Sequence, residues 1–289
     1  MSESGLYLLK DGTHYPSYDS WWSYVESQGL SEVDAEEVWA KLLRDWAQIL
    51  KNDLGEEFKL YDQDGFLILS SLGKTESAAL LHTAQKVKSE LKANLIPEFE
   101  DGAPIFLIVF DNVDKYYGYL EPLYQQDGAE LMASAGVFLS GNTYPHIAIF
   151  HSSDVLDTQT TVAHELTHFY TSPFQIPRWL DEGLASIVQK EAVGLPVLML
   201  DLHTLNDHRG YWDQKNLNAF WSGDLFRDID ANQTLAYQLA ELLVRNLIQA
   251  DRDLFHDFLR SAETEDGGLK AALEIFEVDL NVLAEMIFE

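Results

Sequence analysis

The chain has 289 residues, of which 46% are hydrophobic and 23% charged, an ordinary globular composition that excludes disordered and fibrous proteins. It contains no cysteine, which excludes disulfide frameworks, thiol nucleophiles and Cys-ligated metals, so any metal site must use His, Asp and Glu. Nineteen basic and 48 acidic residues give a net charge of −29, which repels nucleic acids and anionic membrane surfaces.

Residues 1–55 are predicted to form an N-terminal aromatic-rich helical region. A helix is expected from about Val33 to Leu50, with Ser31 or Asp34 as its N-cap. An aromatic cluster precedes this helix and consists of Tyr15, Tyr18, Trp21, Trp22 and Tyr24. We interpret the cluster as core packing, with a binding patch as the alternative.

Residues 56–156 are predicted to form an α+β lobe. The fully apolar run Ile105–Phe110 indicates a buried strand, and Phe66–Leu69 indicates a shorter one. A helix is expected at Thr75–Leu95, where apolar residues recur at helical spacing. Ala135–Leu139 and His146–Phe150 are expected to be neighbouring strands joined by a turn at residues 141–142.

Residues 157–289 are predicted to form a helical lobe. Its expected helices are Asp157–Thr171, Arg178–Glu191, Thr234–Ala250, Arg252–Ala262, Leu269–Phe276 and Leu280–Ile287. A chain whose strands come early and whose helices come late is typical of an α+β fold, or of two lobes meeting at a cleft.

The segment Thr161–Tyr170 contains the pattern H-E-x-x-H. Four residues apart on a helix, His164 and His168 project from one face, so their imidazoles can bind one metal ion. Glu165 then lies beside the metal, where it can take a proton from metal-bound water. The alternative is a helix whose two histidines are solvated or hydrogen-bonded in the core.

A third metal ligand is expected from Glu182, within the segment Pro177–Ala185. Pro177 indicates a helix start, and a helix packed antiparallel to the first could bring Glu182 over the two imidazoles. Two neutral histidines and one carboxylate leave a fourth tetrahedral position open, as in catalytic zinc sites. The alternative is an ordinary surface carboxylate in an acidic protein.

Together, His164-Glu-Leu-Thr-His168 and Trp179-Leu-Asp-Glu182-Gly-Leu-Ala185 resemble the gluzincin zinc metallopeptidases, in particular the thermolysin-like and M1-like "peptidase MA" domains. The resemblance covers residues from about 104 to the C-terminus. It implies a zincin-like two-lobed catalytic domain, with a small β-sheet lobe and a helical lobe. It also implies one Zn²⁺ per chain bound by His164, His168 and Glu182, with Glu165 as general base.

The resemblance further implies that Ala135–Leu139 is the edge strand that pairs with extended peptide. Tyr237 resembles the tyrosine that heads the corresponding family helix and stabilises the oxyanion, although it could equally be a packing residue. This chain also departs from family patterns. Phe174 stands where metzincins have their third histidine, and Ser186 where gluzincins have a supporting Asp, a role that Asp181 could take.

The predicted function is therefore zinc-dependent hydrolysis of peptide bonds by a metal-activated water. The alternative is a catalytically weak or inert metallopeptidase-like binding or regulatory module. The expected partner is a peptide or protein substrate, with neither nucleic acid nor membrane. The net charge indicates solubility, or alternatively a preference for cationic peptides. The absence of a signal-peptide pattern and of a long apolar run predicts a cytoplasmic location.

Overall fold

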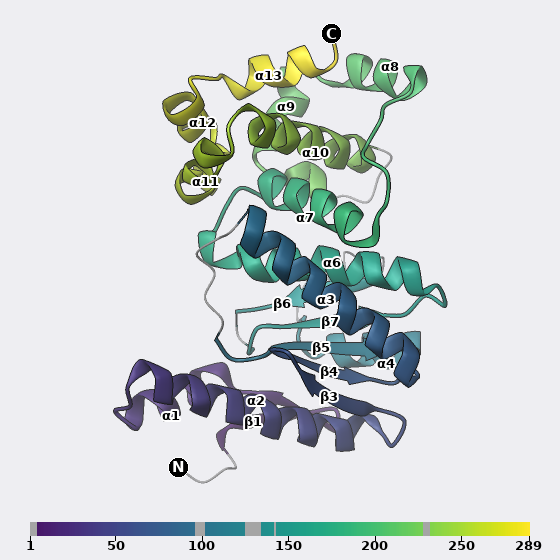
Figure 1. The fold of residues 1–289 in the computed structure, drawn as a ribbon, viewed down its shortest axis with the longest axis vertical. Helices are drawn as coiled ribbons and strands as arrows, with labels where there is room; N and C mark the ends of the chain where they lie inside the picture. The colour runs from purple at the N-terminus through teal and green to yellow at the C-terminus, as the bar shows by residue number, and fades with distance from the viewer. Residues whose placement is uncertain (1–4, 96–101, 125–133, 142, 228–231) are drawn as a thin grey trace. The chain divides into compact units, whose positions relative to one another are not determined.

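The computed structural model describes residues 5–95, 102–124, 134–141, 143–227 and 232–289. They form an α+β fold with one five-stranded mixed sheet and one two-stranded sheet, which confirms the predicted class (Figure 1). The chain divides into two compact units, residues 1–88 with 98–169 and residues 89–97 with 170–289. One boundary between the units thus falls between residues 169 and 170.

The first unit is built around the five-stranded sheet, whose strand order is β3-β4-β5-β7-β6. Its strands are β3 (Lys59–Gln63), β4 (Phe66–Ser70), β5 (Ile105–Phe110), β6 (Gly136–Leu139) and β7 (His146–Phe150). β4, β5 and β7 are parallel, and the edge strands β3 and β6 each run antiparallel to their neighbour. The predicted β5 is confirmed as a central strand, buried at every position.

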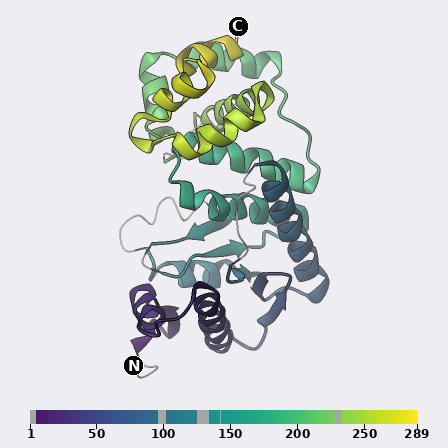
Figure 2. The ribbon, with the colours of Figure 1, turned by 60° about the vertical axis from the view of Figure 1, so that its left-hand side comes forward.

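One face of this sheet carries an aromatic core shared with the N-terminal region. The helices on this face are α2 (Glu32–Leu54) and α4 (Val113–Leu120), and α1 (Tyr18–Ser27) packs on α2. Trp46 of α2 contacts Phe106 of β5 edge-on, with ring centroids 5.0 Å apart. Ser31 caps α2, as predicted, by accepting the N–H of Asp34. The described part of residues 1–55 therefore shares one core with the sheet. Figure 2 shows the purple N-terminal helices beside the strands.

The N-terminal region is less helical than the sequence predicted. It begins with a two-stranded sheet, β1 (Tyr7–Lys10) and β2 (Thr13–Pro16), paired antiparallel. The turn residues Asp11 and Gly12 both have positive φ, 48° and 84°, which is the backbone of a type I′ hairpin turn. An Asp-Gly pair between two short strands is itself a hairpin signal in the sequence.

The opposite face of the sheet is covered by α3 (Lys74–Asn94) and α6 (Val155–Thr171). Gln159 of α6 donates a hydrogen bond of 2.8 Å to Thr83 of α3, which links the two helices. Figure 1 shows α6 and α2 on opposite sides of the strands. This arrangement puts α6, which carries the H-E-x-x-H pattern, against the sheet face that includes the edge strand β6.

The second unit is helical. Its helices are α7 (Arg178–Val193), α8 (Leu202–Tyr211), α9 (Gln214–Trp221), α10 (Gln233–Ala250), α11 (Arg252–Ser261), α12 (Leu269–Phe276) and α13 (Leu280–Ile287). Short 3₁₀ turns occur at Ser172–Phe174, Asp224–Phe226 and Thr264–Asp266. The sequence did not predict α8 and α9, whose N-termini are capped by Asp201 and Asp213. No helix among the described residues has the length and apolarity needed to cross a bilayer.

Candidate metal centre

Two of the predicted ligands lie on α6, whose apolar residues fix its orientation. Val162, Ala163 and Leu166 are fully buried, which leaves His164 and His168 half-buried on another side of the helix. The two imidazoles meet edge to face, with ring centroids 4.7 Å apart and planes at 82°. The four-residue spacing has thus produced the expected pair of neighbouring histidines.

The third predicted ligand, Glu182, is almost fully buried on α7. α7 is held in the second unit by Trp179, a buried residue whose indole N–H donates a 2.9 Å hydrogen bond to the carbonyl of Gly267. Arg178, one turn before Glu182, places its Nε 3.5 Å from Glu182 Oε1. Glu182 is therefore not the ordinary surface carboxylate of the alternative interpretation.

The residue after Glu182 explains part of the motif. A Cβ at Gly183 would lie 2.7 Å from the carbonyl oxygen of Ala240 and 2.7 Å from a methyl group of Val244, both on α10. Ordinary carbon contacts are about 3.5–4.0 Å, so only glycine allows α7 and α10 to approach this closely. The contact with α10 fixes the position of the turn of α7 that carries Glu182.

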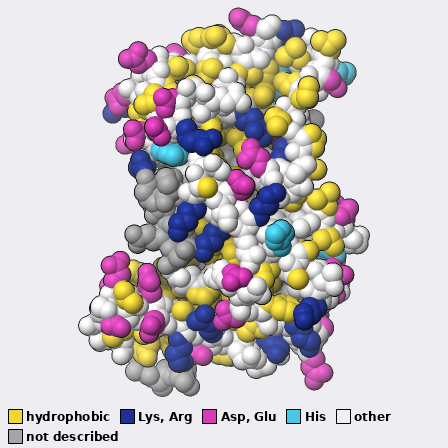
Figure 3. All heavy atoms as spheres, viewed as in Figure 1, with side chains coloured by type: hydrophobic (Ala, Val, Ile, Leu, Met, Phe, Trp, Pro, Cys, Tyr) yellow, Lys and Arg dark blue, Asp and Glu magenta, His cyan; other side chains and the backbone are white. Residues whose placement is uncertain are grey.

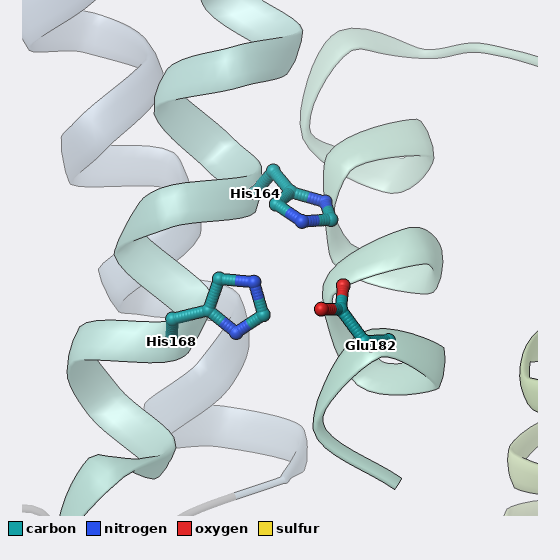
Figure 4. A group of neighbouring side chains, drawn as sticks. All are labelled: His164, His168 and Glu182. Atoms are coloured by element: carbon teal, nitrogen blue, oxygen red, sulfur yellow. The ribbon is translucent and has the colours of Figure 1, made fainter. Parts of the chain in front are cut away.

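The structure brings the three predicted ligands together. One potential ligand atom each from His164, His168 and Glu182 all lie within 4.8 Å of one another. Figure 4 shows the carboxylate of Glu182 directed toward the two imidazoles. Two nitrogens and one oxygen suit zinc, whose bonds of about 2.0–2.2 Å place tetrahedral ligands about 3.4 Å apart. The upper limit of 4.8 Å between the ligand atoms is wider than this spacing, so binding would require the side chains to close around the ion.

Glu165 is buried beside this group and faces the edge strand. Its Oε2 accepts a 2.8 Å hydrogen bond from the backbone N–H of Phe138 in β6. Among the described residues, Oε1 of Glu165 accepts no hydrogen bond. The carboxylate is thus anchored through one oxygen, and the second oxygen remains available to a water molecule.

The N–H of Phe138 belongs to the free edge of the sheet. Phe150 donates its backbone N–H to the carbonyl of Ala135 at 2.8 Å, so these two residues form a hydrogen-bonded pair of the ladder. Such pairs alternate along antiparallel strands, and Val137 with Ala148 is therefore the next one. The backbone groups of Phe138 accordingly point away from β7.

The edge strand predicted at Ala135–Leu139 is confirmed as an edge, but side chains already occupy part of its outer side. Ser134 Oγ accepts the N–H of Gly136 at 3.2 Å and donates to the Gly136 carbonyl. Together with the contact between Phe138 and Glu165, these bonds cap three of the backbone groups that face outward. Pairing of this edge with an extended peptide stays a prediction.

Two residues near Glu165 were not singled out from the sequence. A Cβ at Gly136 would lie 2.4 Å from a methyl carbon of Thr161 and 2.9 Å from Cγ of Glu165, so glycine lets β6 approach α6. Burial raises the pKa of Tyr116, and the charge of Glu165 raises it further, which keeps the phenol neutral. A glycine inside a strand was the available signal for the first residue.

The remaining candidates have more ordinary positions. Tyr237 is the fifth residue of α10 rather than its first, because the helix begins at Gln233. Its ring packs edge-on against Phe226, with centroids 5.3 Å apart, and its role in stabilising an oxyanion stays a prediction. Asp181 accepts a hydrogen bond from Thr171, and Ser186 is buried within α7.

Comparison with known proteins adds no assignment. No protein-family model, no curated protein and no solved structure matches this chain.

Proposed function

We propose that the protein is a zinc-dependent peptidase of the gluzincin type, with a zincin-like two-lobed catalytic domain. The observation that carries this proposal is the convergence of His164, His168 and Glu182, whose ligand atoms lie within 4.8 Å. Two helices supply these residues at the spacing that the motifs require. The antiparallel edge strand β6 beside the motif helix is a second feature expected of this class.

His164, His168 and Glu182 would hold the metal. A zinc ion in such a site supplies Lewis acidity, which lowers the pKa of a bound water and polarises a carbonyl group. Arg178 places a positive charge beside Glu182, with its Nε 3.5 Å from Glu182 Oε1. Burial of Glu182 keeps bulk water away from the ligand and strengthens its electrostatic interactions.

Glu165 is the proposed general base. The N–H of Phe138 orients the carboxylate through Oε2, and Oε1 can then accept a proton from the attacking water. The same oxygen can return the proton to the leaving amine, so that one carboxylate serves both halves of the reaction. The carboxylate must be ionised to accept the proton in the first step.

The proposed substrates are peptides, with cationic sequences preferred because the chain carries a net charge of −29. This preference is electrostatic and should weaken with salt, since exposed charges more than about 10 Å apart are largely screened at 0.1 M ionic strength. Cleavage of basic and acidic peptides of equal length, compared at low and high salt, tests it. Equal rates at low salt would contradict the preference.

Metal analysis of the purified protein is the first test. Wild type should contain one zinc per chain, and His168→Ala should lose it. His203→Ala is a matched control, because His203 is an exposed histidine that pairs with Asp207 on its own helix. Absence of zinc from wild type after reconstitution, or its retention in His168→Ala, would refute the proposed site.

Cleavage of a peptide library is the second test. Wild-type activity should disappear with a chelator and return with zinc. Glu165→Gln should keep the metal and cleave about 10²–10⁴-fold more slowly, because the amide cannot accept a proton. Normal turnover by Glu165→Gln would exclude this residue as the base. Zinc binding without any cleavage would instead favour the inert binding module.

A further inference from the structure

A second candidate site lies on the N-terminal helices, in a cavity of about 260 Å³. Its lining residues come from α1, α2 and the turn between them, and they are Trp22, Val25, Glu26, Gly29, Leu30, Ala35 and Trp39. All of these residues except Glu26 present apolar surface. The cavity therefore combines two aromatic rings and an aliphatic wall with a single carboxylate.

The two tryptophans of this cavity differ from the other five in the chain. Each of those five donates its indole N–H to a protein acceptor, in the pairs Trp21–Leu6, Trp46–His14, Trp179–Gly267, Trp212–His208 and Trp221–Asn281. No described residue accepts the indole N–H of Trp22 or Trp39. Trp22 is also 50% exposed, whereas Trp21 beside it is fully buried. The predicted aromatic cluster thus divides into core residues and a ring that faces solvent.

The rings of Trp22 and Trp39 are inclined to each other, and both line the cavity. The centroids of Trp22 and Trp39 are 5.9 Å apart, and their planes are inclined by 47°. Tyr18 packs behind both rings, with centroids 6.4 Å from Trp22 and 5.9 Å from Trp39. This backing holds the indoles in place, so a ligand would meet preformed aromatic surface.

The charge around the cavity has one sign. Residues 18–39 include six carboxylates and no Lys, Arg or His. The next basic residues along α2, Lys41 and Arg44, are paired with Asp45 and Asp62. Glu26 forms no ion pair with any residue that the structure describes. Figure 3 shows acidic and hydrophobic side chains side by side over α1.

We propose that this cavity binds an organic cation, namely an ammonium group that carries alkyl substituents. Tryptophan faces attract such cations through the ring quadrupole, and a nearby carboxylate adds a Coulombic attraction. The lining fits a metal ion poorly, because it offers one carboxylate. It fits a sugar poorly as well, because hydroxyl groups would meet a single polar side chain and lose hydrogen bonds to water.

The test compares choline with 3,3-dimethylbutan-1-ol, which has the same shape without the charge. Binding is followed through tryptophan fluorescence and by calorimetry. Choline should bind with a Kd in the range of about 0.1–1 mM, which suits a partly exposed site, and the alcohol should bind at least ~10-fold more weakly. Glu26→Gln and Trp22→Leu should each weaken choline binding by ~3–10-fold. Glu285→Gln, which removes one exposed charge from the second unit, should leave binding unchanged.

Several results would overturn the proposal. Equal binding of choline and the alcohol would show an apolar cavity that does not recognise charge. Unchanged choline affinity in Glu26→Gln would exclude the carboxylate, and the lack of saturable binding well above ~1 mM would exclude the site. Glu26→Gln alters no buried contact, so it keeps the test valid even if Trp22→Leu disturbs α1. All of these measurements are independent of zinc and of peptidase activity.

Discussion

Replacement of Gly136 by Ala tests how β6 and α6 are held together beside Glu165. The added methyl would lie 2.4 Å from a methyl carbon of Thr161 and 2.9 Å from Cγ of Glu165. Ordinary carbon contacts are about 3.5–4.0 Å, so the overlap exceeds 1 Å at Thr161 and 0.5 Å at Glu165. The strand must move outward or the helix must shift.

The two overlaps determine how much stability Gly136→Ala should lose. Inserting a methyl group into a packed interface costs about 1–3 kcal/mol, and both neighbours here are attached to a helix that packs on the sheet. We expect Gly136→Ala to lower the free energy of unfolding by about 2 kcal/mol. Thr161→Ser removes the nearer methyl and keeps the hydroxyl that donates to Asp157. The double variant should therefore recover about 1 kcal/mol relative to the sum of the single changes.

Urea unfolding of the four proteins of this double-mutant cycle provides the measurement. Hydrogen exchange of peptides from β6 and α6 assigns the change to the first unit, since the two units need not unfold together. Additive effects within about 0.3 kcal/mol would refute the reasoning, because contacting residues must couple. Unchanged stability of Gly136→Ala would show that the strand relaxes freely and that its glycine does not position Glu165.

Two further predictions concern buried polar groups. Burial lowers the pKa of His146 to about 4, so the folded protein resists protonation of this histidine, whereas the unfolded chain binds the proton below about pH 6.5. The free energy of unfolding should therefore fall by about 3 kcal/mol between pH 6.5 and 4, as measured by urea unfolding. His146→Gln should abolish this pH dependence. Glu241 is a buried residue that pairs with Lys190 and Arg245. Its replacement by Gln should lower the free energy of unfolding by about 3–5 kcal/mol, as measured by thermal unfolding. Replacement of the half-exposed Glu191 by Gln should cost at most ~1 kcal/mol, and an equal effect of both changes would contradict this account.

The parts of the fold that were predicted correctly have strong local signals. The apolar run Ile105–Phe110 is a buried central strand, and the helices Leu269–Phe276 and Leu280–Ile287 have the predicted ends. In each case the hydrophobic pattern agrees with the packing that the element finally adopts. An element can be predicted from the sequence when its local preference agrees with its tertiary packing in this way.

The helix α8 shows why other elements were missed. Its sequence, Leu202–Tyr211, is largely polar, its apolar residues do not recur on one face, and only His208 is buried. His208 accepts the indole N–H of Trp212 at 2.9 Å and stacks on Phe288, with centroids 4.2 Å apart. The stacking contact joins residues 80 positions apart in the sequence, so it leaves no periodic pattern within the helix.

In the candidate site, too, some features follow from local spacing and others depend on tertiary structure. His164 and His168 could be paired from their spacing alone, because four residues on a helix fix their relation. The hydrogen bond from Phe138 to Glu165 depends on strand register and on the distance between a helix and a sheet. No spacing rule gives either quantity, and only the glycine two residues before Phe138 marks the close approach.

Both carboxylates of the candidate site lie beside a glycine at a close contact between two elements. Gly136 admits α6 to β6 at Glu165, and Gly183 admits α10 to α7 next to Glu182. A carboxylate that only solvates a surface requires no such approach. A metal ligand or a general base must be held within about 0.5 Å of its working position, and sites built on packed helices and strands achieve this better than sites on loops. The two close contacts thus provide the fixed positions that the proposed roles of Glu165 and Glu182 would require.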